Sequence, residues 1–144
     1  MKTLEMCPTA KATRLQTVIK SPTRDISFLL VEDEALIRMM VAGMIEELGH
    51  TVAAEAGNIA DALNLAQSAQ FRVALLDINL AGHRIDPVAE IIERRGLPFI
   101  FSSGYGAKGL PAKFYDRPVL QKPFLIERLV EAIEAAVGGT TSLR

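Results

Sequence analysis

The chain has 144 residues, of which 49% are hydrophobic and 23% are charged, so its length and composition suit a single globular domain. Its formal net charge of −1 argues against a strongly basic nucleic-acid binder. No apolar run approaches the roughly 18–20 residues that span a bilayer, which argues against a membrane protein.

The first 24 residues differ in charge from the rest of the chain. Five basic residues and Glu5 give them a net charge of +4, which leaves −5 for the remainder. We interpret residues 1–24 as a basic, disordered leader, with a docking arm as the alternative that stays open. Cys7 is the single cysteine and cannot form an internal disulfide, which favours a reducing compartment and a cytoplasmic location.

From residue 25 onwards, apolar runs alternate with segments of helical spacing. The apolar run at residues 26–31, broken only by Ser27, is typical of a strand covered on both faces. We predict further strands at residues 51–56, 73–76, 98–103 and 118–121. Helical spacing of apolar residues predicts helices at residues 35–48, 59–69, 86–95 and 124–137. We expect Gly49 and Asn58 to serve as helix caps, and Gly138 to end the last helix before a flexible tail at 139–144.

This alternation of strands and helices predicts the fold class. It implies right-handed crossovers and a parallel sheet. Residues 25–138 then form a flavodoxin-like, doubly wound α/β domain, whose five-stranded sheet has the order 2-1-3-4-5. Glycines and prolines are dense between residues 104 and 118, and they oppose a long helix, so we expect the fourth helix to be short or mobile.

Polar side chains follow the predicted strands at the point where each strand ends. Glu32 and Asp33 follow the first strand, Asp77 the third, Ser103 the fourth and Lys122 the fifth. In an open parallel sheet the ligand site lies beyond the carboxyl ends of the strands, and the first and third strands are neighbours in this order. Carboxylates gathered there repel one another and call for a cation, and their hard oxygens favour Mg²⁺.

An acidic cluster with a bound metal can accept a phosphoryl group. Asp77 would attack phosphorus as a carboxylate nucleophile. The metal, the Lys122 ammonium and the Ser103 hydroxyl would then share the charge on the transferred oxygens.

Four motifs in this order resemble the receiver domain of two-component response regulators. They read Leu-Leu-Val-Glu-Asp-Glu, Ala-Leu-Leu-Asp-Ile-Asn-Leu, Pro-Phe-Ile-Phe-Ser-Ser-Gly and Gln-Lys-Pro-Phe, and the resemblance covers about residues 26–137. It implies that Asp77 is the phosphoacceptor and that Asp33 ligates Mg²⁺ directly. It also implies that Glu32 acts on the metal through water and that the backbone carbonyl of Asn79 is the remaining protein ligand.

The same resemblance implies roles for Ser103 and Lys122. Ser103 matches the hydroxyl that swings toward the phosphoryl group, and Lys122 matches the phosphate-binding lysine. The Lys122–Pro123 peptide bond matches one that is cis in the family.

Three features depart from the common family pattern. Glu32 stands where most relatives have aspartate. Val119 stands where many have an aromatic switch residue. Phe101-Ser102-Ser103-Gly104 resembles the motif of a single-domain subgroup with a Phe-Ala-Thr-Gly-like sequence and a poorly formed fourth helix. In that subgroup, the resemblance implies, signalling uses order and disorder of the fourth-helix region.

Several nearby residues have simpler interpretations. Ser102 is the neighbour most easily confused with Ser103. Tyr105 lies two residues further on, where the family tunes the lifetime of the phosphoryl group. We expect His50 and His83 to be surface residues and Asp86 to be a helix N-cap.

The leading hypothesis is a stand-alone response regulator without an output domain. A histidine kinase or a histidine phosphotransfer protein would supply the phosphoryl group. The protein, a monomer or a weak homodimer, would pass the signal on by contact with an unknown downstream protein. A phosphorylation-independent adaptor and a phosphate sink are the alternatives. A phosphohydrolase is disfavoured, because Asn79 stands where such enzymes commonly carry an acidic proton donor. The sequence also lacks the glycine motifs of nucleotide carriers.

Overall fold

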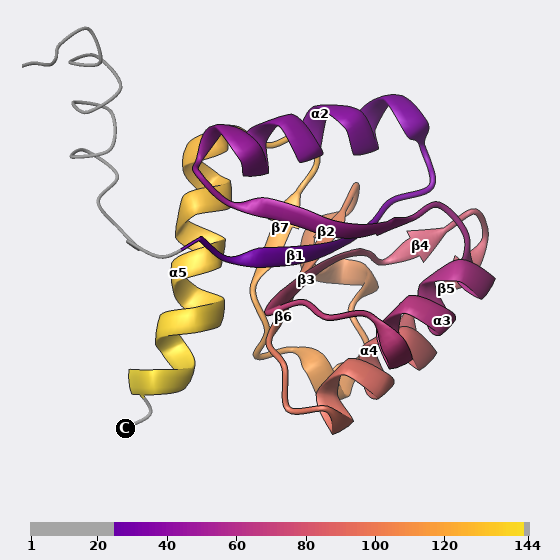
Figure 1. The fold of residues 1–144 in the computed structure, drawn as a ribbon. Helices are drawn as coiled ribbons and strands as arrows, with labels where there is room; N and C mark the ends of the chain where they lie inside the picture. The colour runs from indigo at the N-terminus through magenta and orange to yellow at the C-terminus, as the bar shows by residue number, and fades with distance from the viewer. Residues whose placement is uncertain (1–24, 143–144) are drawn as a thin grey trace, which may run out of the picture.

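A computed structural model describes residues 25–142 of the chain. A five-stranded parallel sheet forms its centre, with the order β2-β1-β3-β6-β7 (Figure 1). Its strands are β1 (Ser27–Val31), β2 (Thr51–Ala56), β3 (Val73–Asp77), β6 (Phe99–Ser103) and β7 (Val119–Gln121). Four α-helices flank it: α2 (Ala35–Glu47), α3 (Ile59–Ser68), α4 (Asp86–Arg94) and α5 (Ile126–Ser142). In chain order the strands are arranged 2-1-3-4-5, which confirms the predicted flavodoxin-like topology.

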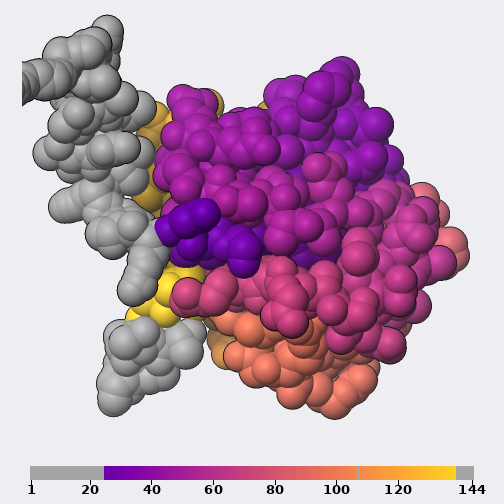
Figure 2. Space-filling view, viewed as in Figure 1, coloured from indigo at the N-terminus to yellow at the C-terminus, as the bar shows by residue number. Residues whose placement is uncertain are grey.

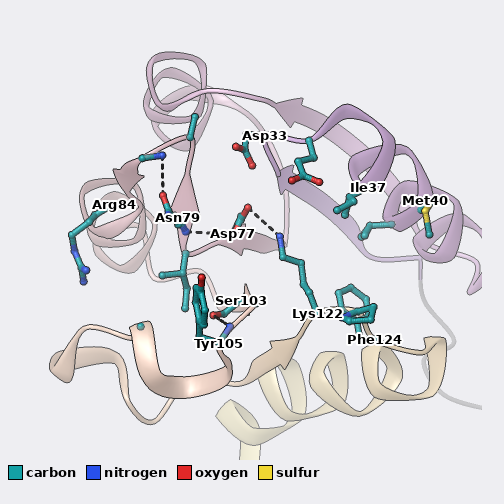
Figure 3. Close-up of a pocket in the computed structure, with 18 of the residues that line it drawn as sticks. Asp33, Ile37, Met40, Asp77, Asn79, Arg84, Ser103, Tyr105, Lys122 and Phe124 are labelled. Atoms are coloured by element: carbon teal, nitrogen blue, oxygen red, sulfur yellow. Dashed lines mark hydrogen bonds and ion pairs between the residues drawn. The ribbon is translucent and has the colours of Figure 1, made fainter.

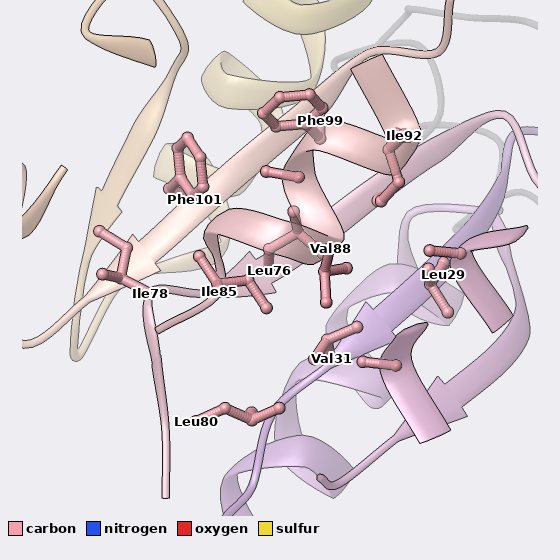
Figure 4. Close-up of a cluster of buried hydrophobic side chains, with 14 of the residues drawn as sticks. Leu29, Val31, Leu76, Ile78, Leu80, Ile85, Val88, Ile92, Phe99 and Phe101 are labelled. Atoms are coloured by element: carbon pink, nitrogen blue, oxygen red, sulfur yellow. The ribbon is translucent and has the colours of Figure 1, made fainter. Parts of the chain in front are cut away.

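Both faces of the central strands are buried, which explains their continuous apolar sequences. In β1, Leu29 and Val31 belong to the cluster packed against α3 and α4, whereas Phe28 and Leu30 belong to the cluster packed against α2 and α5. Figure 4 shows the first cluster, where Leu76 of β3 lies among side chains of α4. Each strand therefore supplies alternate residues to two cores, and the sheet is held from both sides.

Two short 3₁₀ helices take the place of a full fourth helix. They are η2 (Gly106–Gly109) and η3 (Ala112–Phe114). Phe114 is fully buried, and its ring meets those of Phe99 and Phe101 at centroid distances of 5.4 and 5.8 Å. The prediction of a short segment is confirmed, because glycine and proline prevent a longer helix while Phe114 ties the segment to the core.

The caps of the first two helices follow the predicted chemistry, but two other predictions were wrong. Gly49 follows α2 with a φ of 91°, and the Asn58 side chain accepts a hydrogen bond from the Asp61 amide at 2.8 Å. Gly138 does not end the last helix, because α5 continues to Ser142. Asp86 is not an N-cap: Ile85 holds that position, and Asp86 lies in the first turn, where it pairs with Arg84 at 3.1 Å.

Another wrong prediction concerns His50. Its side chain is buried at the amino end of the sheet, where Nδ1 accepts a hydrogen bond from the Ile26 amide at 3.1 Å. Burial lowers the pKa of His50, although Asp25 opposes this. His83 is exposed, as predicted. It belongs to a small hairpin of β4 (Asn79–Leu80) and β5 (His83–Arg84) that the apolar pattern did not reveal.

The predicted leader, including Cys7, lies outside the described residues, as do residues 143 and 144. In the view of Figure 2, which is that of Figure 1, side chains of α2, β2 and α3 form a continuous surface. Within residues 25–142, no helix combines the length and apolar character needed to cross a bilayer.

Candidate phosphoacceptor site

The carboxyl ends of four strands, β1, β3, β6 and β7, bring together the polar residues that the sequence singled out. Glu32 directly follows β1, Asp77 is the last residue of β3, and Lys122 directly follows β7. Because β1 and β3 are neighbours and all the strands point the same way, their ends share one edge of the sheet. Figure 3 shows Asp33, Asp77, Asn79, Ser103 and Lys122 around one pocket at this edge.

Lys122 bridges two buried carboxylates. Its Nζ donates a hydrogen bond to Glu32 Oε1 at 3.1 Å and another to Asp77 Oδ2 at 3.3 Å. The Glu32 and Asp77 side chains are only 4% and 6% exposed, so both carboxylates are largely removed from water. Their attraction to Lys122 is therefore screened less than a surface ion pair would be.

The acidic side chains outnumber this cation. Glu32, Asp33 and Asp77 each place a carboxylate oxygen within 4.8 Å of the others. With Lys122, the four groups carry a formal charge of −2 when all are ionised. Hard oxygen atoms in this arrangement suit a small divalent cation such as Mg²⁺, and Asp33 at the half-exposed rim leaves an approach from solvent.

The surroundings of Asp77 make its ionisation costly. Burial, followed by repulsion from Glu32, raises the pKa of Asp77 to about 7, while Lys122 and the Asn79 amide act in the opposite direction. Burial pulls the pKa of Lys122 down, but Asp77 and Glu32 more than offset this and raise it above its ordinary value. A cation near Asp77 would favour its ionised, nucleophilic form.

Ser103 and Asn79 complete the polar wall of the pocket. Ser103 is buried, and its Oγ accepts a hydrogen bond from the Tyr105 amide at 2.9 Å. The Asn79 amide donates to Asp77 Oδ1 at 3.4 Å, while the Asn79 side chain accepts a hydrogen bond from the Gly82 amide. Ser102 is also buried, and it pairs with Leu120 in the sheet. The Lys122–Pro123 peptide bond is cis, as the family resemblance implied.

The pocket also has an apolar half that the sequence reasoning missed. Its volume is about 720 Å³, and Ile37, Met40, Met44 and Phe124 line it beside Lys122. Figure 3 shows that Met40 comes from α2 and Phe124 from the segment before α5. The apolar spacing at residues 35–48 predicted a helix but not this lining, and Met40 on that helix is 56% exposed.

The protein is thus a doubly wound α/β domain with an acidic pocket. Clustered carboxylates, a lysine and a hydroxyl lie in that pocket at the carboxyl edge of the sheet. The chain belongs to the response regulator receiver domain family, whose sequence profile matches residues 28–134. Domains of this family are generally phosphoacceptor switches that work in two-component signalling.

Relatives in sequence and in structure agree with this family. The chain is 34% identical over 113 residues to the transcriptional regulatory protein PdtaR of Mycobacterium tuberculosis, in a match that covers 76% of this chain and 55% of PdtaR. It therefore spans about half the length of the curated relatives that it matches. Among solved structures, SdrG of Sphingomonas melonis Fr1 is 36% identical, with a TM-score of 0.70 and coverage of 78% of this chain and 97% of SdrG.

The receiver domain of PhyR from Erythrobacter litoralis is a further structural relative. It is 30% identical, with a TM-score of 0.66, and the match covers 79% of this chain and 91% of that domain.

Proposed function

We propose that this protein is a response regulator that accepts a phosphoryl group on Asp77 and signals through contact with other proteins. The bridge from Lys122 to Asp77 and Glu32 carries this proposal. It places an ammonium group beside the carboxylate at which transferred oxygens would gather negative charge.

The transfer would form one bond and break another. An Asp77 carboxylate oxygen would attack phosphorus, and the bond between phosphorus and a histidine nitrogen of the donor would break. The electron pair of that bond would return to the donor imidazole, which leaves an acyl phosphate on Asp77. Lys122 and the Ser103 hydroxyl would hold the transferred oxygens, and self-phosphorylation and hydrolysis would use the same groups.

The acidic residues are suited to hold Mg²⁺ during this reaction. Asp33 and Asp77 would be direct ligands, together with the backbone carbonyl of Asn79, and Glu32 would act through water. The short separation of the carboxylate oxygens supports this donor set. When bound, Mg²⁺ neutralises charge on the phosphoryl oxygens.

The change in signalling state would take place in residues 104–117. Ser103 Oγ accepts its hydrogen bond from the Tyr105 amide, so a Ser103 that turned toward a phosphoryl group would release the start of this segment. Val119 precludes an aromatic flip at its position. The short helices η2 and η3 are therefore the structures that we expect to rearrange.

Exposed apolar side chains beside the pocket support a protein partner. Leu36, Met39 and Met40 on α2 are 67%, 64% and 56% exposed, and Leu125 is 68% exposed. We propose that a histidine kinase or a histidine phosphotransfer protein docks over this surface, which would present its histidine to Asp77.

Acetyl phosphate with Mg²⁺ tests the proposed acceptor. Intact-mass measurement should show one phosphoryl group on the wild type, and none on Asp77→Asn. The matched control is Asp86→Asn, which removes a partly buried carboxylate of α4 that does not line the pocket, and it should be labelled normally. Persistent labelling of Asp77→Asn would refute the assignment.

A further inference from the structure

Arg38 ties the backbone of the acidic pocket to the edge of the sheet. From the first turns of α2, its Nη1 donates a hydrogen bond of 2.6 Å to the backbone carbonyl of Glu32. Its Nε pairs with Glu55 Oε1 of β2 at 3.2 Å. The Arg38 side chain is 23% exposed, so its guanidinium group is partly withdrawn from water while it holds two strands at their carboxyl ends.

Glu32 is thereby fixed at every polar group that it has. Its amide donates to the Ala56 carbonyl at 3.0 Å, and its carbonyl accepts from Arg38. Its carboxylate accepts from Lys122 Nζ and from the Glu34 amide. The Glu32 carbonyl and the Asp33 amide belong to one planar peptide unit, so a bond that holds the carbonyl also fixes how Asp33 leaves the strand.

Gly57 provides the space in which the guanidinium group lies. A Cβ atom on Gly57 would come within 2.7 Å of Arg38 Nη1, the same nitrogen that holds Glu32. Gly57 is not among the glycines with positive φ, so its backbone would accept alanine. The close approach of Arg38 therefore explains the glycine at this position.

We propose that Arg38 is a positioning residue, which holds the Glu32–Asp33 peptide so that both acidic side chains face the cation site, with Gly57 as the gap that admits it. This inference rests on the proposed function. Arg38 touches neither the phosphoryl group nor the metal in this role, since it acts through backbone geometry.

Magnesium titration by calorimetry tests this role without phosphorylation. Arg38→Met keeps the apolar stem and removes the donors, and we expect it to raise the Kd for Mg²⁺ about 10-fold. Arg38→Lys keeps one donor for the Glu32 carbonyl and should bind Mg²⁺ more tightly than Arg38→Met. Glu55→Gln breaks only the outer ion pair and should leave the Kd within about twofold of the wild type.

Gly57→Ala provides an independent variant, because it displaces the guanidinium group without altering Arg38. It should weaken Mg²⁺ binding about as much as Arg38→Met, and the double variant should be no weaker than either single one. Urea unfolding without Mg²⁺ identifies variants that simply fail to fold.

The outcomes separate this role from the proposed function. Equal Mg²⁺ affinity in the wild type and Arg38→Met, with normal labelling of Asp77, would overturn the role of Arg38 alone. Additive losses in the double variant would also overturn it. Absence of Mg²⁺ binding by the wild type would overturn both proposals.

Discussion

The buried polar groups at the two ends of the central sheet differ in how well their charges are balanced. At the amino end, His50 accepts a hydrogen bond from the Ile26 amide. Toward the opposite edge of the sheet, Arg117 lies 4.2 Å from the centroid of the Phe99 ring and pairs with Glu93 at 3.3 Å. At the carboxyl end, Glu32, Asp33 and Asp77 face the ammonium group of Lys122.

The amino end is therefore matched in charge and the carboxyl end is not. Polar groups at the amino end have partners that satisfy them within the folded chain, which makes them contributors to stability. Excess negative charge at the carboxyl end opposes folding until a cation joins it. We infer that the carboxyl end binds a cation, whereas the polar groups of the amino end stabilise the fold.

Removal of Lys122 should have the largest effect. Lys122→Met leaves Glu32 and Asp77 without their shared cation and should lower the free energy of unfolding by about 3 kcal/mol in metal-free buffer. Mg²⁺ should restore part of the loss. Lys113→Met is the matched control, because it removes a half-exposed ion pair, in which Lys113 Nζ lies 3.7 Å from Glu93 Oε1. It should lower the free energy of unfolding by less than about 1 kcal/mol. Urea denaturation with and without Mg²⁺ measures both.

Neutralising Asp77 should have the opposite sign. Asp77→Asn relieves the burial of a charge and its repulsion by Glu32, so it should raise the free energy of unfolding by roughly 2 kcal/mol at pH 8 without metal. Mg²⁺ should stabilise the wild type more than this variant. A lower stability of Asp77→Asn than of the wild type under metal-free conditions would contradict the inference that excess negative charge at the carboxyl end opposes folding.

The raised pKa of Asp77 also fixes the direction of its pH dependence. The folded pKa is about 7 against an ordinary value of 3.8, so the folded state binds more protons between these values. The stability that comes from protonating Asp77 in the folded state is therefore fully present below the ordinary pKa of 3.8. It is lost as the pH rises through the folded pKa of about 7. Metal-free unfolding from pH 4 to 8 should show this loss in the wild type and not in Asp77→Asn.

Arg117 should report the behaviour of the amino end. Arg117→Met loses the contact with the Phe99 ring and the pair with Glu93, and should lower the free energy of unfolding by about 1 kcal/mol. Because this region is remote from the acidic pocket, the loss should be the same with and without Mg²⁺. A loss that Mg²⁺ reverses would show that the two ends are linked.

His50 should give the smallest effect. Its pKa is lowered in the folded protein, so the unfolded chain binds more protons as pH falls below the ordinary value of 6.5. The contribution of neutral His50 is present above that pH and is lost as pH falls, the reverse of the dependence of Asp77. His50→Gln should flatten the acid side of the wild-type stability profile, measured by thermal unfolding.

Much of the fold was predictable because its sheet is covered on both faces. Alternate residues of β1 and β3 enter different cores, so both strands had to be apolar throughout. The end of α5 was not predictable, because Gly138 disfavours a helix by only about 1 kcal/mol and does not stop one. His50 was misjudged because its partner, the Ile26 amide, is 24 residues away in sequence.

The candidate site was predictable because parallel strands bring their carboxyl ends to one edge. Only that topology was needed to gather Asp33, Asp77, Ser103 and Lys122 around one pocket (Figure 3). The sequence could not reveal that the longer Glu32 side chain reaches Lys122 Nζ. Nor could it reveal the hold of Arg38 on the Glu32 carbonyl, because that bond depends on the rotamer of a long side chain.

A crystal structure with Mg²⁺ and beryllofluoride is the most direct test of the central claim, that these groups converge on one divalent cation beside Asp77. We expect beryllium on an Asp77 carboxylate oxygen, a single Mg²⁺ touching Asp33, Asp77 and the Asn79 carbonyl, and Lys122 Nζ on a fluorine. Beryllofluoride on another side chain, or Mg²⁺ away from these three ligands, would contradict the account.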